Sequence, residues 1–161
     1  MQGSDTQHPL IRRLAADDIE RIMTIEQAAY PYPWTRGIFQ DCLQVGYACF
    51  GLQLGKDLVG YSIFNWAAGE AHLLNICIHP DWQQQGYGSL LLEYTISRVT
   101  RLQNDALFLE VRSSNPQAVT LYSKRGFATV GRRPDYYRAD DGREDAVIMR
   151  LELVPQIMSP A

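Results

Sequence analysis

The sequence predicts a mixed α+β fold, and three features in the middle of the chain lead to this prediction. The apolar run Leu73–Ile78 has the length and branching of a buried strand. A second strand, Ala106–Arg112, lies further along the chain. Because strand–helix–strand crossovers are right-handed, the segment between these strands should pack on the sheet and the strands should be parallel. That segment has the i, i+3, i+4, i+7 spacing of an amphipathic helix in Leu92, Thr95, Ile96 and Val99.

A short strand and a helix are expected at the N-terminal end. Leu10–Leu14 is typical of a strand, and Asp17 with Glu20 three residues later is typical of a helix start. The apolar side of this helix consists of Ile19, Ile22, Met23 and Ala29.

An aromatic elbow, Tyr30–Trp34, follows that helix. Its two prolines force extended geometry on the residues before them and end the helix. Thr35 is expected to cap a second helix that runs from Arg36 to about Leu43. The elbow can be a hydrophobic plug over the core or the wall of a groove for a peptide, and the residues alone leave both interpretations open.

Two further strands, Tyr47–Leu54 and Leu58–Asn65, are separated only by Gly55, Lys56 and Asp57, a spacing that suits a hairpin. They lead into the central strand that ends at Ile78.

The C-terminal part contains another helix and two strands. Asn115 and Pro116 form a strong helix start, since asparagine caps well and proline is tolerated at the first helical position. Gly126 ends this helix. A strand is expected at 127–131, then a polar excursion at 132–145 and a last strand at 146–153.

Composition limits the class of protein. With 161 residues, a single domain is expected at 8–154, with flexible tails at 1–7 and 155–161. A net charge of −3 argues against nucleic acid as a partner. No apolar run approaches the roughly 18 residues of a membrane span, and the polar start is unlike a signal peptide, so no membrane association is expected.

Cysteine and histidine usage indicates neither disulfides nor a metal. The three cysteines are odd in number and lack metal-type pairing, which favours a reducing cytoplasm with free thiols. The three histidines are scattered and lack ligand spacing. We therefore expect no metal cofactor and a cytoplasmic location.

The loop Gln83–Gly88 lies where the central strand gives way to the helix. The first turn of a helix offers unpaired backbone N–H groups and the positive end of the dipole, and glycines let the backbone approach an anion, so a phosphate or pyrophosphate ligand is predicted. The loop lacks the lysine of a P-loop and the third glycine of a dinucleotide fingerprint. The alternative is a strand-to-helix turn in which the glycines relieve backbone strain and no ligand binds.

Four features in order resemble the GNAT family of N-acetyltransferases over nearly the whole chain. They are the strand with Asn75–Ile78, the Q-x-x-G-x-G loop, Leu109–Glu110–Val111, and the stretch from Asn115 to Phe127. The resemblance implies the GNAT acyl-CoA N-acyltransferase fold: a mostly antiparallel sheet of six or seven strands, about four flanking helices, and two splayed parallel central strands. It implies acetyl-CoA as co-substrate, with its pantetheine arm beside Ile76, Cys77 and Ile78 and its pyrophosphate on Gln83, Gln84, Gln85, Gly86, Tyr87 and Gly88.

A second set of residues resembles the ribosomal-protein-alanine N-acetyltransferases within this family. This set is Glu110–Asn115, Tyr136–Tyr137 and Asp141–Ala146. It implies as partner the N-terminal peptide of a small-subunit ribosomal protein, acetylated on its alanine. An acetyltransferase for a small-molecule amine and a non-catalytic coenzyme A sensor remain as alternatives.

Glu110 and Tyr122 are the candidate catalytic residues. Glu110 points away from the apolar row of its strand, and the matching family position implies a general base. The alternative is an exposed strand residue paired with Arg112. Tyr122 is the candidate acid, because a pKa near 10 suits protonation of a thiolate; the alternative is a core tyrosine.

Four other residues complete the candidate site. Asn115 resembles the asparagine of the family that contacts acetyl-CoA, and it can act as a helix cap at the same time. Tyr32, Trp34 and Tyr136 are the candidate contacts to the acceptor peptide, together with acidic residues of the last loop. Cys77 is not expected to be a nucleophile, since no histidine is placed to activate it.

Overall fold

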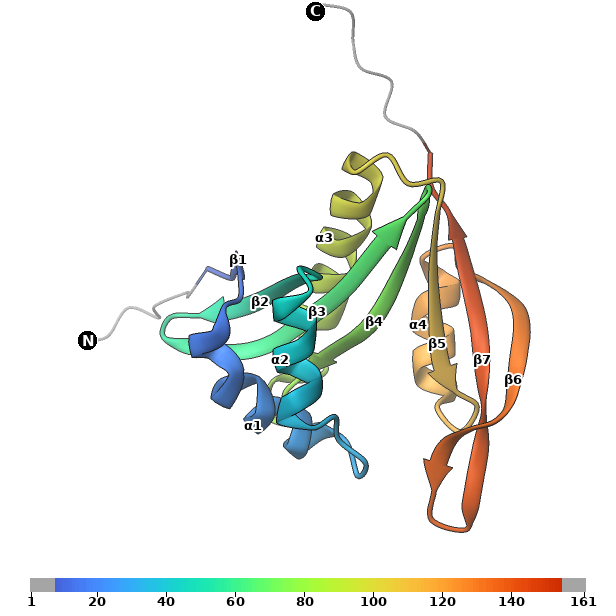
Figure 1. Ribbon diagram of the computed structural model, residues 1–161, viewed down its shortest axis with the longest axis horizontal. Coiled ribbons are helices and arrows are strands. Elements are labelled where there is room, and N and C mark those ends of the chain that lie inside the picture. The colour runs from blue at the N-terminus through green and yellow to red at the C-terminus, as the bar shows by residue number, and fades with distance from the viewer. Residues whose placement is uncertain (1–7, 155–161) are drawn as a thin grey trace, which may run out of the picture. The chain divides into compact units, whose positions relative to one another are not determined.

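A computed structural model of the chain describes residues 8–154 and contains the expected alternation of strands and helices (Figure 1). The predicted tails, 1–7 and 155–161, lie outside the described residues. Two short 3-10 helices, Ala16–Asp18 and Pro80–Trp82, accompany the main elements. The α-helices are α1 (Ile19–Ala29), α2 (Arg36–Gln44), α3 (Tyr87–Arg101) and α4 (Pro116–Lys124). The strands are β1 (Leu10–Arg13), β2 (Ala48–Leu54), β3 (Asp57–Ala67), β4 (Glu70–Ile78), β5 (Ala106–Arg112), β6 (Ala128–Ala139) and β7 (Gly142–Glu152).

The strands form a seven-stranded sheet in the order β1-β2-β3-β4-β5-β7-β6. β4 and β5 are parallel, with Glu70 opposite Ala106 at one end of the ladder and Leu73 opposite Leu109 at the other. β5 and β7 pair antiparallel, from Ala106 opposite Glu152 to Arg112 opposite Ala146. The mixed α+β fold, the mostly antiparallel sheet and the parallel central pair are therefore confirmed.

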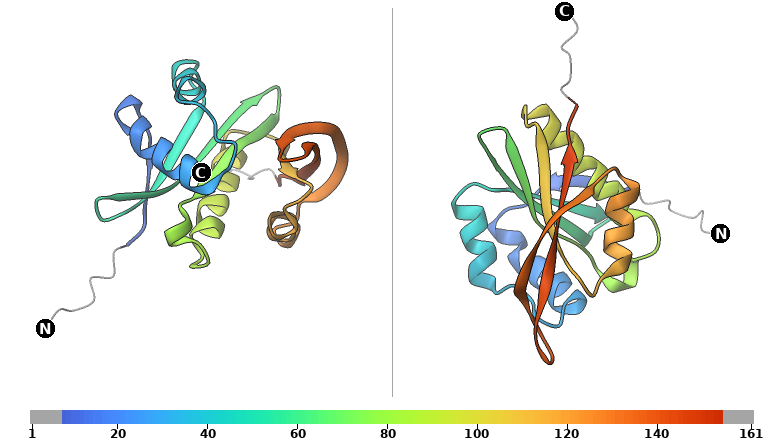
Figure 2. Two further views of the ribbon diagram at one scale, coloured as in Figure 1. Left: turned by 90° about the horizontal axis from the view of Figure 1, so that it is seen from below. Right: turned by 90° about the vertical axis from the view of Figure 1, so that its right-hand side faces the viewer.

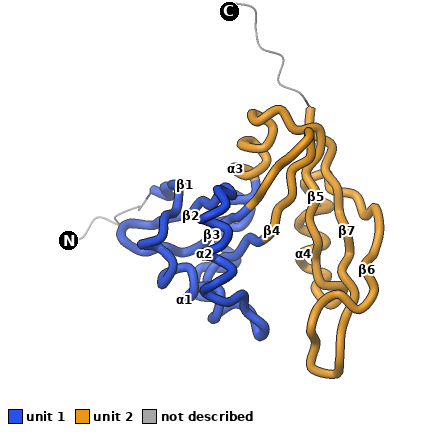
Figure 3. The backbone as a smooth tube through the Cα atoms, in the orientation of Figure 1, with its two compact units in different colours: residues 1–63, 75–92 blue, residues 64–74, 93–161 orange. Residues whose placement is uncertain are grey.

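Two compact units make up the chain (Figure 3). Among the described residues, the first contains 8–63 and 75–92, and the second contains 64–74 and 93–154. The expectation of a single domain over 8–154 stays a prediction. The largest buried cluster of the first unit joins α1 and α2 to β2, β3 and β4, through residues such as Ile22, Phe39, Cys49, Tyr61 and Cys77.

The prediction that residues 132–145 form a polar loop between two strands is wrong. β6 and β7 instead form a long hairpin, drawn in orange to red in Figure 2, whose turn lies between Ala139 and Gly142. The prediction failed because none of the β6 residues is buried, so the strand lacks the apolar alternation that reveals a half-buried strand.

The predicted cap of the first helix is also displaced by one residue. The N-cap residue of α1 is Asp18, not Asp17, and its side chain makes no capping hydrogen bond to α1. It accepts instead from the backbone N–H of Ala15, at 2.9 Å, at the start of the preceding 3-10 helix. Arg12 holds the same carboxylate in a salt bridge at 2.7 Å. The other predicted caps are confirmed, since the Thr35 and Asn115 side chains accept from Ile38 N and Ala118 N.

Gly60 in β3 allows a close approach of β4. A Cβ at this position would lie 2.8 Å from the carbonyl oxygen of Cys77 and would also overlap the Ile78 side chain. Gly60→Ala is therefore expected to lower the free energy of unfolding by about 1–3 kcal/mol. Gly37→Ala is the matched control, because a Cβ there meets only Thr35 Oγ1, at 3.8 Å. Equal urea midpoints for both variants would contradict this account.

Two negative findings concern the described residues alone. None of their helices is long and apolar enough to cross a membrane. They also contain no group of three or more histidine, cysteine or acidic residues that could hold a metal ion. The expectations of a cytoplasmic location and of no metal cofactor stay predictions.

Candidate active site

The candidate site residues divide between the two units. The first unit contains Gln83–Gly88, Ile76–Ile78 and the aromatic elbow. The second contains Glu110, Asn115, Tyr122 and Tyr136.

The loop 83–88 has the backbone geometry expected for an anion-binding turn. Gln84 and Gly86 have positive φ, 61° and 88°, a conformation that glycine adopts without strain. The carbonyl of Gly86 accepts from Leu90 N at 3.1 Å and so closes the first turn of α3. The N–H groups of that turn have no acceptor within the helix, and the residues at 83–86 are exposed. This arrangement can bind a phosphate through backbone donors.

The side chain of Gln83 has a structural contact. Its Nε2 donates to the carbonyl oxygen of Ile78 at 2.9 Å and ties the loop to the end of β4. One N–H of this side-chain amide is thus used within the protein.

The Cys77 thiol is buried in β4. Burial, reinforced by the nearby Glu26 carboxylate, raises the pKa of this thiol to about 12. Because the thiolate is the nucleophilic form, the thiol is inert near neutral pH. This agrees with the prediction that no covalent cysteine intermediate is used.

The elbow packs on the core of the first unit and keeps part of its aromatic surface accessible. The ring of Trp34 lies 5.3 Å from that of Phe39, and Tyr30 packs on the same cluster. Tyr32 and Trp34 are each partly exposed. The plug interpretation therefore describes one face of the elbow, and the exposed part leaves the peptide interpretation open.

Glu110 projects from β5 with its side chain about a quarter exposed. The sequence alternative paired it with Arg112, but the ion pair in the structure is with Arg133 of β6, whose Nε lies 2.8 Å from Glu110 Oε1. Arg112 pairs with Glu144, at 2.7 Å. Glu110 is therefore a carboxylate held in place by a cation, with further oxygen lone pairs able to accept a proton.

Two tyrosines of β6 lie beside this carboxylate. Burial, and then a hydrogen bond to Glu110, raise the pKa of Tyr136 above its usual range. Burial and the Glu110 charge likewise raise the pKa of Tyr137, over whose ring Arg112 lies at 4.5 Å. Both hydroxyls therefore remain protonated near neutral pH and are able to donate a hydrogen bond.

Tyr122 is buried on α4, with its ring 5.6 Å from that of Phe127 in an edge-on contact. It contributes to the raised pKa of Tyr137. Asn115 caps the same helix, accepting from Ala118 N at 3.1 Å. The second unit thus brings together a carboxylate and several tyrosine hydroxyls, the groups needed to remove a proton from an amine and to return one to a thiolate.

A comparison with known proteins identifies the family. The acetyltransferase (GNAT) family model matches residues 19–127, which is more than half of the chain. The chain belongs to the acetyltransferase (GNAT) family. It is an acetyl-CoA-dependent N-acetyltransferase, and the alternative of a non-catalytic coenzyme A sensor is not retained.

Two relatives of this GNAT chain have the same name. It is 37% identical over 143 residues to the [ribosomal protein bS18]-alanine N-acetyltransferase of Escherichia coli, covering 89% of this chain and 97% of the relative. The enzyme of that name from Haemophilus influenzae is 38% identical over 145 residues, or 89% of this chain and 99% of the relative. The resemblance to the ribosomal-protein-alanine group, also called RimI, is thereby confirmed.

A solved structure agrees with these matches. The crystal structure of the ribosomal-protein-S18-alanine N-acetyltransferase from Escherichia coli superposes on this chain with a TM-score of 0.87 and 34% identity. The match covers 96% of this chain and 99% of that one.

Two of the acidic residues expected to receive a peptide, Glu144 and Asp145, have internal partners in this GNAT chain. Glu144 accepts hydrogen bonds from the backbone N–H of Ser114 and from Arg112. Hydrogen bonding with Ser114, and then with Arg112, lowers the pKa of this carboxyl. Asp145 accepts from Arg132 and from the N–H of Asp135. Asp145 therefore links β7 to β6, and Glu144 links β7 to β5 and the residues that follow it, so neither carboxylate is a free charge.

Sequence reasoning missed two functional candidates, Arg133 and Glu26. Arg133 fell within the supposed polar excursion, and only the hairpin brings it to Glu110. Glu26 carried a signal that was overlooked: it follows Ile22 by four residues and Met23 by three, which places a carboxylate on the apolar stripe of α1.

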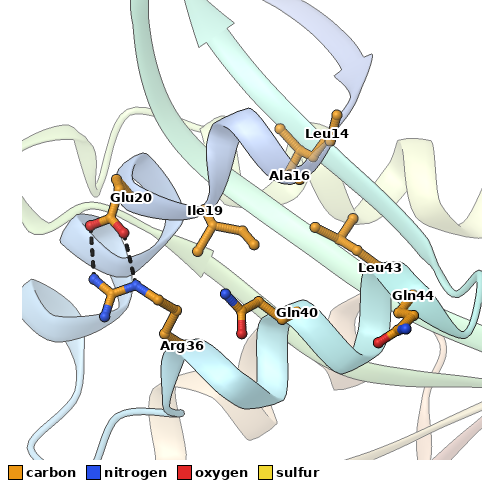
Figure 4. A pocket seen from close by; sticks show the side chains of 9 residues that line it. Leu14, Ala16, Ile19, Glu20, Arg36, Gln40, Leu43 and Gln44 are labelled. Carbon is orange, nitrogen blue, oxygen red and sulfur yellow. Dashed lines mark hydrogen bonds and ion pairs between the residues drawn. The ribbon is translucent and has the colours of Figure 1, made fainter.

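A cavity of about 540 Å³ lies between α1 and α2 and is separate from every predicted site residue (Figure 4). Its wall includes Leu14, Ile19, Gln40 and Leu43. At one end Glu20 and Arg36 form a salt bridge at 2.8 Å.

The two roles of Asn115 can be separated by substitution. Asn115→Ala removes the cap, which costs about 1 kcal/mol, or roughly 2–4 °C in Tm for a chain of this size. Asn115→Asp keeps a good cap but cannot donate a hydrogen bond. We expect a raised KM for acetyl-CoA in both variants and a lowered Tm in the alanine variant alone. A wild-type KM for Asn115→Asp would show that the residue is only a cap.

Proposed function

We propose that this enzyme transfers the acetyl group of acetyl-CoA to the α-amine of the N-terminal alanine of ribosomal protein bS18. The observation that carries the proposal is the shared name of relatives 37–38% identical over nearly their whole length. The cluster around Glu110 supplies chemistry suited to such an acceptor.

In the proposed reaction the neutral amine attacks the thioester carbonyl directly. The new C–N bond forms as the C–S bond breaks, Glu110 takes the amine proton, directly or through water, and Tyr122 protonates the coenzyme A thiolate. The backbone donors of residues 83–88 bind the pyrophosphate, and Ile76–Ile78 bind the pantetheine arm. Tyr32, Trp34 and Tyr136 contact the acceptor peptide.

An α-amine is an acceptor that a single general base can deprotonate. Its pKa is about 8, so roughly a tenth of it is neutral at pH 7, whereas a lysine side chain with a pKa of about 10.4 needs about 3 kcal/mol more for deprotonation. A single carboxylate is therefore sufficient for an N-terminal acceptor.

The test is an acetylation assay with a synthetic peptide that carries the N-terminal sequence of bS18. The purified enzyme and acetyl-CoA should add one acetyl group to the α-amine, located by tandem mass spectrometry. The same peptide with a blocked N-terminus should not react. Reaction of spermidine or an aminoglycoside, with no reaction of the peptide, would establish the small-amine alternative and overturn the proposal.

A further inference from the structure

Glu26 is a buried charged residue that the proposed mechanism does not use. It lies on α1 and is only 2% exposed. A carboxylate removed from water in this way is costly unless hydrogen bonds compensate it. Its partners therefore indicate what it holds in place.

The two oxygens of Glu26 face different parts of the first unit. Oε2 accepts the backbone N–H of Trp34, in the elbow, at 2.8 Å. Oε1 accepts the Nδ2 group of Asn75 in β4, at 3.0 Å, and the hydroxyl of Tyr61 in β3. One side chain on α1 thus joins the elbow to two strands of the sheet.

A second contact fixes the other end of the elbow. The hydroxyl of Tyr30 donates to the carbonyl oxygen of Ile76 in β4, at 3.1 Å. The elbow between Tyr30 and Trp34 is therefore attached at both ends, and Tyr32 lies between the two attachments.

We propose that Glu26 is a positioning residue that holds the elbow in the conformation that binds the acceptor peptide. The inference rests on the proposed function, in which Tyr32 and Trp34 contact that peptide. Glu26 acts through the Trp34 backbone, so its loss should weaken peptide binding and leave acetyl-CoA binding intact.

The chemistry of the partners predicts which substitutions are tolerated. The N–H of Trp34 can only donate, whereas the Tyr61 hydroxyl and the Asn75 amide can each donate or accept. Glutamine at position 26 can therefore direct its oxygen to Trp34 and its NH₂ group to the other two. Methionine fills a similar volume but leaves the Trp34 N–H without an acceptor.

The experiment measures both KM values and kcat for the full-length variants with the bS18 peptide. Glu26→Met should raise the peptide KM about tenfold or more, and Glu26→Gln should stay within about twofold, with the KM for acetyl-CoA unchanged in both. Tyr61→Phe is the matched control, because it removes an Oε1 partner and spares Oε2, and its peptide KM should match the wild type. A wild-type peptide KM in Glu26→Met, or equal rises in both KM values, would overturn the inference.

Hydrogen exchange of the Trp34 amide gives a readout that is independent of turnover. Its protection should be lost in Glu26→Met and kept in Glu26→Gln. If the wild type acetylates no peptide, the proposed function fails, while this readout still tests the attachment of the elbow. If the methionine variant does not fold, the glutamine variant decides: loss of Trp34 protection with a wild-type peptide KM would overturn the inference.

Discussion

Glu110→Gln is expected to lower kcat for the N-terminal alanine peptide by about 100-fold or more, the usual contribution of a general base. The amide keeps the size of the side chain and can still accept from Arg133, but it cannot take the amine proton. Activity should recover as the pH rises through about 8, because the amine then loses its proton to solvent. Steady-state rates between pH 6 and 10 measure both effects.

The control for this experiment is Glu152→Gln, which makes the same change at an exposed position of β7. It should keep the wild-type kcat and pH profile. If Glu110→Gln retains full activity at pH 7 while folded and able to bind acetyl-CoA, the carboxylate is not the base.

Tyr122→Phe is expected to lower kcat by about 100-fold, the lower end of the range for general acid catalysis. The ring keeps its edge-on contact with Phe127, so thermal stability should change little. The loss should appear in kcat and leave the dissociation constant for coenzyme A, measured by calorimetry, unchanged.

Tyr137→Phe is the matched control for the acid, since the pKa of this second hydroxyl is raised by burial and by Glu110. It should retain most of the activity. Should Tyr137→Phe lose activity and Tyr122→Phe keep it, the proton donor is Tyr137, and the assignment of Tyr122 is wrong.

Local sequence signals predicted much of the fold. The caps at Thr35 and Asn115 and the bounds of β5 depend on residues within one turn or strand of each other, so they are visible in the sequence. The β6–β7 hairpin was missed because its polar side chains are stabilised by partners on other segments, such as Arg112 with Glu144. The one-residue error at Asp17 has a similar origin, since Asp18 is selected by Arg12.

The sequence suggested candidate site residues but not their contacts. Family motifs pointed to Glu110 and Tyr136, but no local pattern connects Glu110 with Arg133, which is 23 residues away. The partners of Glu26 are still more distant, with Asn75 49 residues away along the chain. Contacts of this kind depend on the arrangement of strands, which periodicity does not encode.

The most direct measurement of the central claim uses ribosomal small-subunit proteins incubated with acetyl-CoA and either the wild-type enzyme or Glu110→Gln, followed by tandem mass spectrometry. The account predicts an acetyl group on the N-terminal alanine of bS18 with the wild type, and almost none with the variant in the same time. Unmodified bS18, or acetylation confined to lysine side chains, would contradict it.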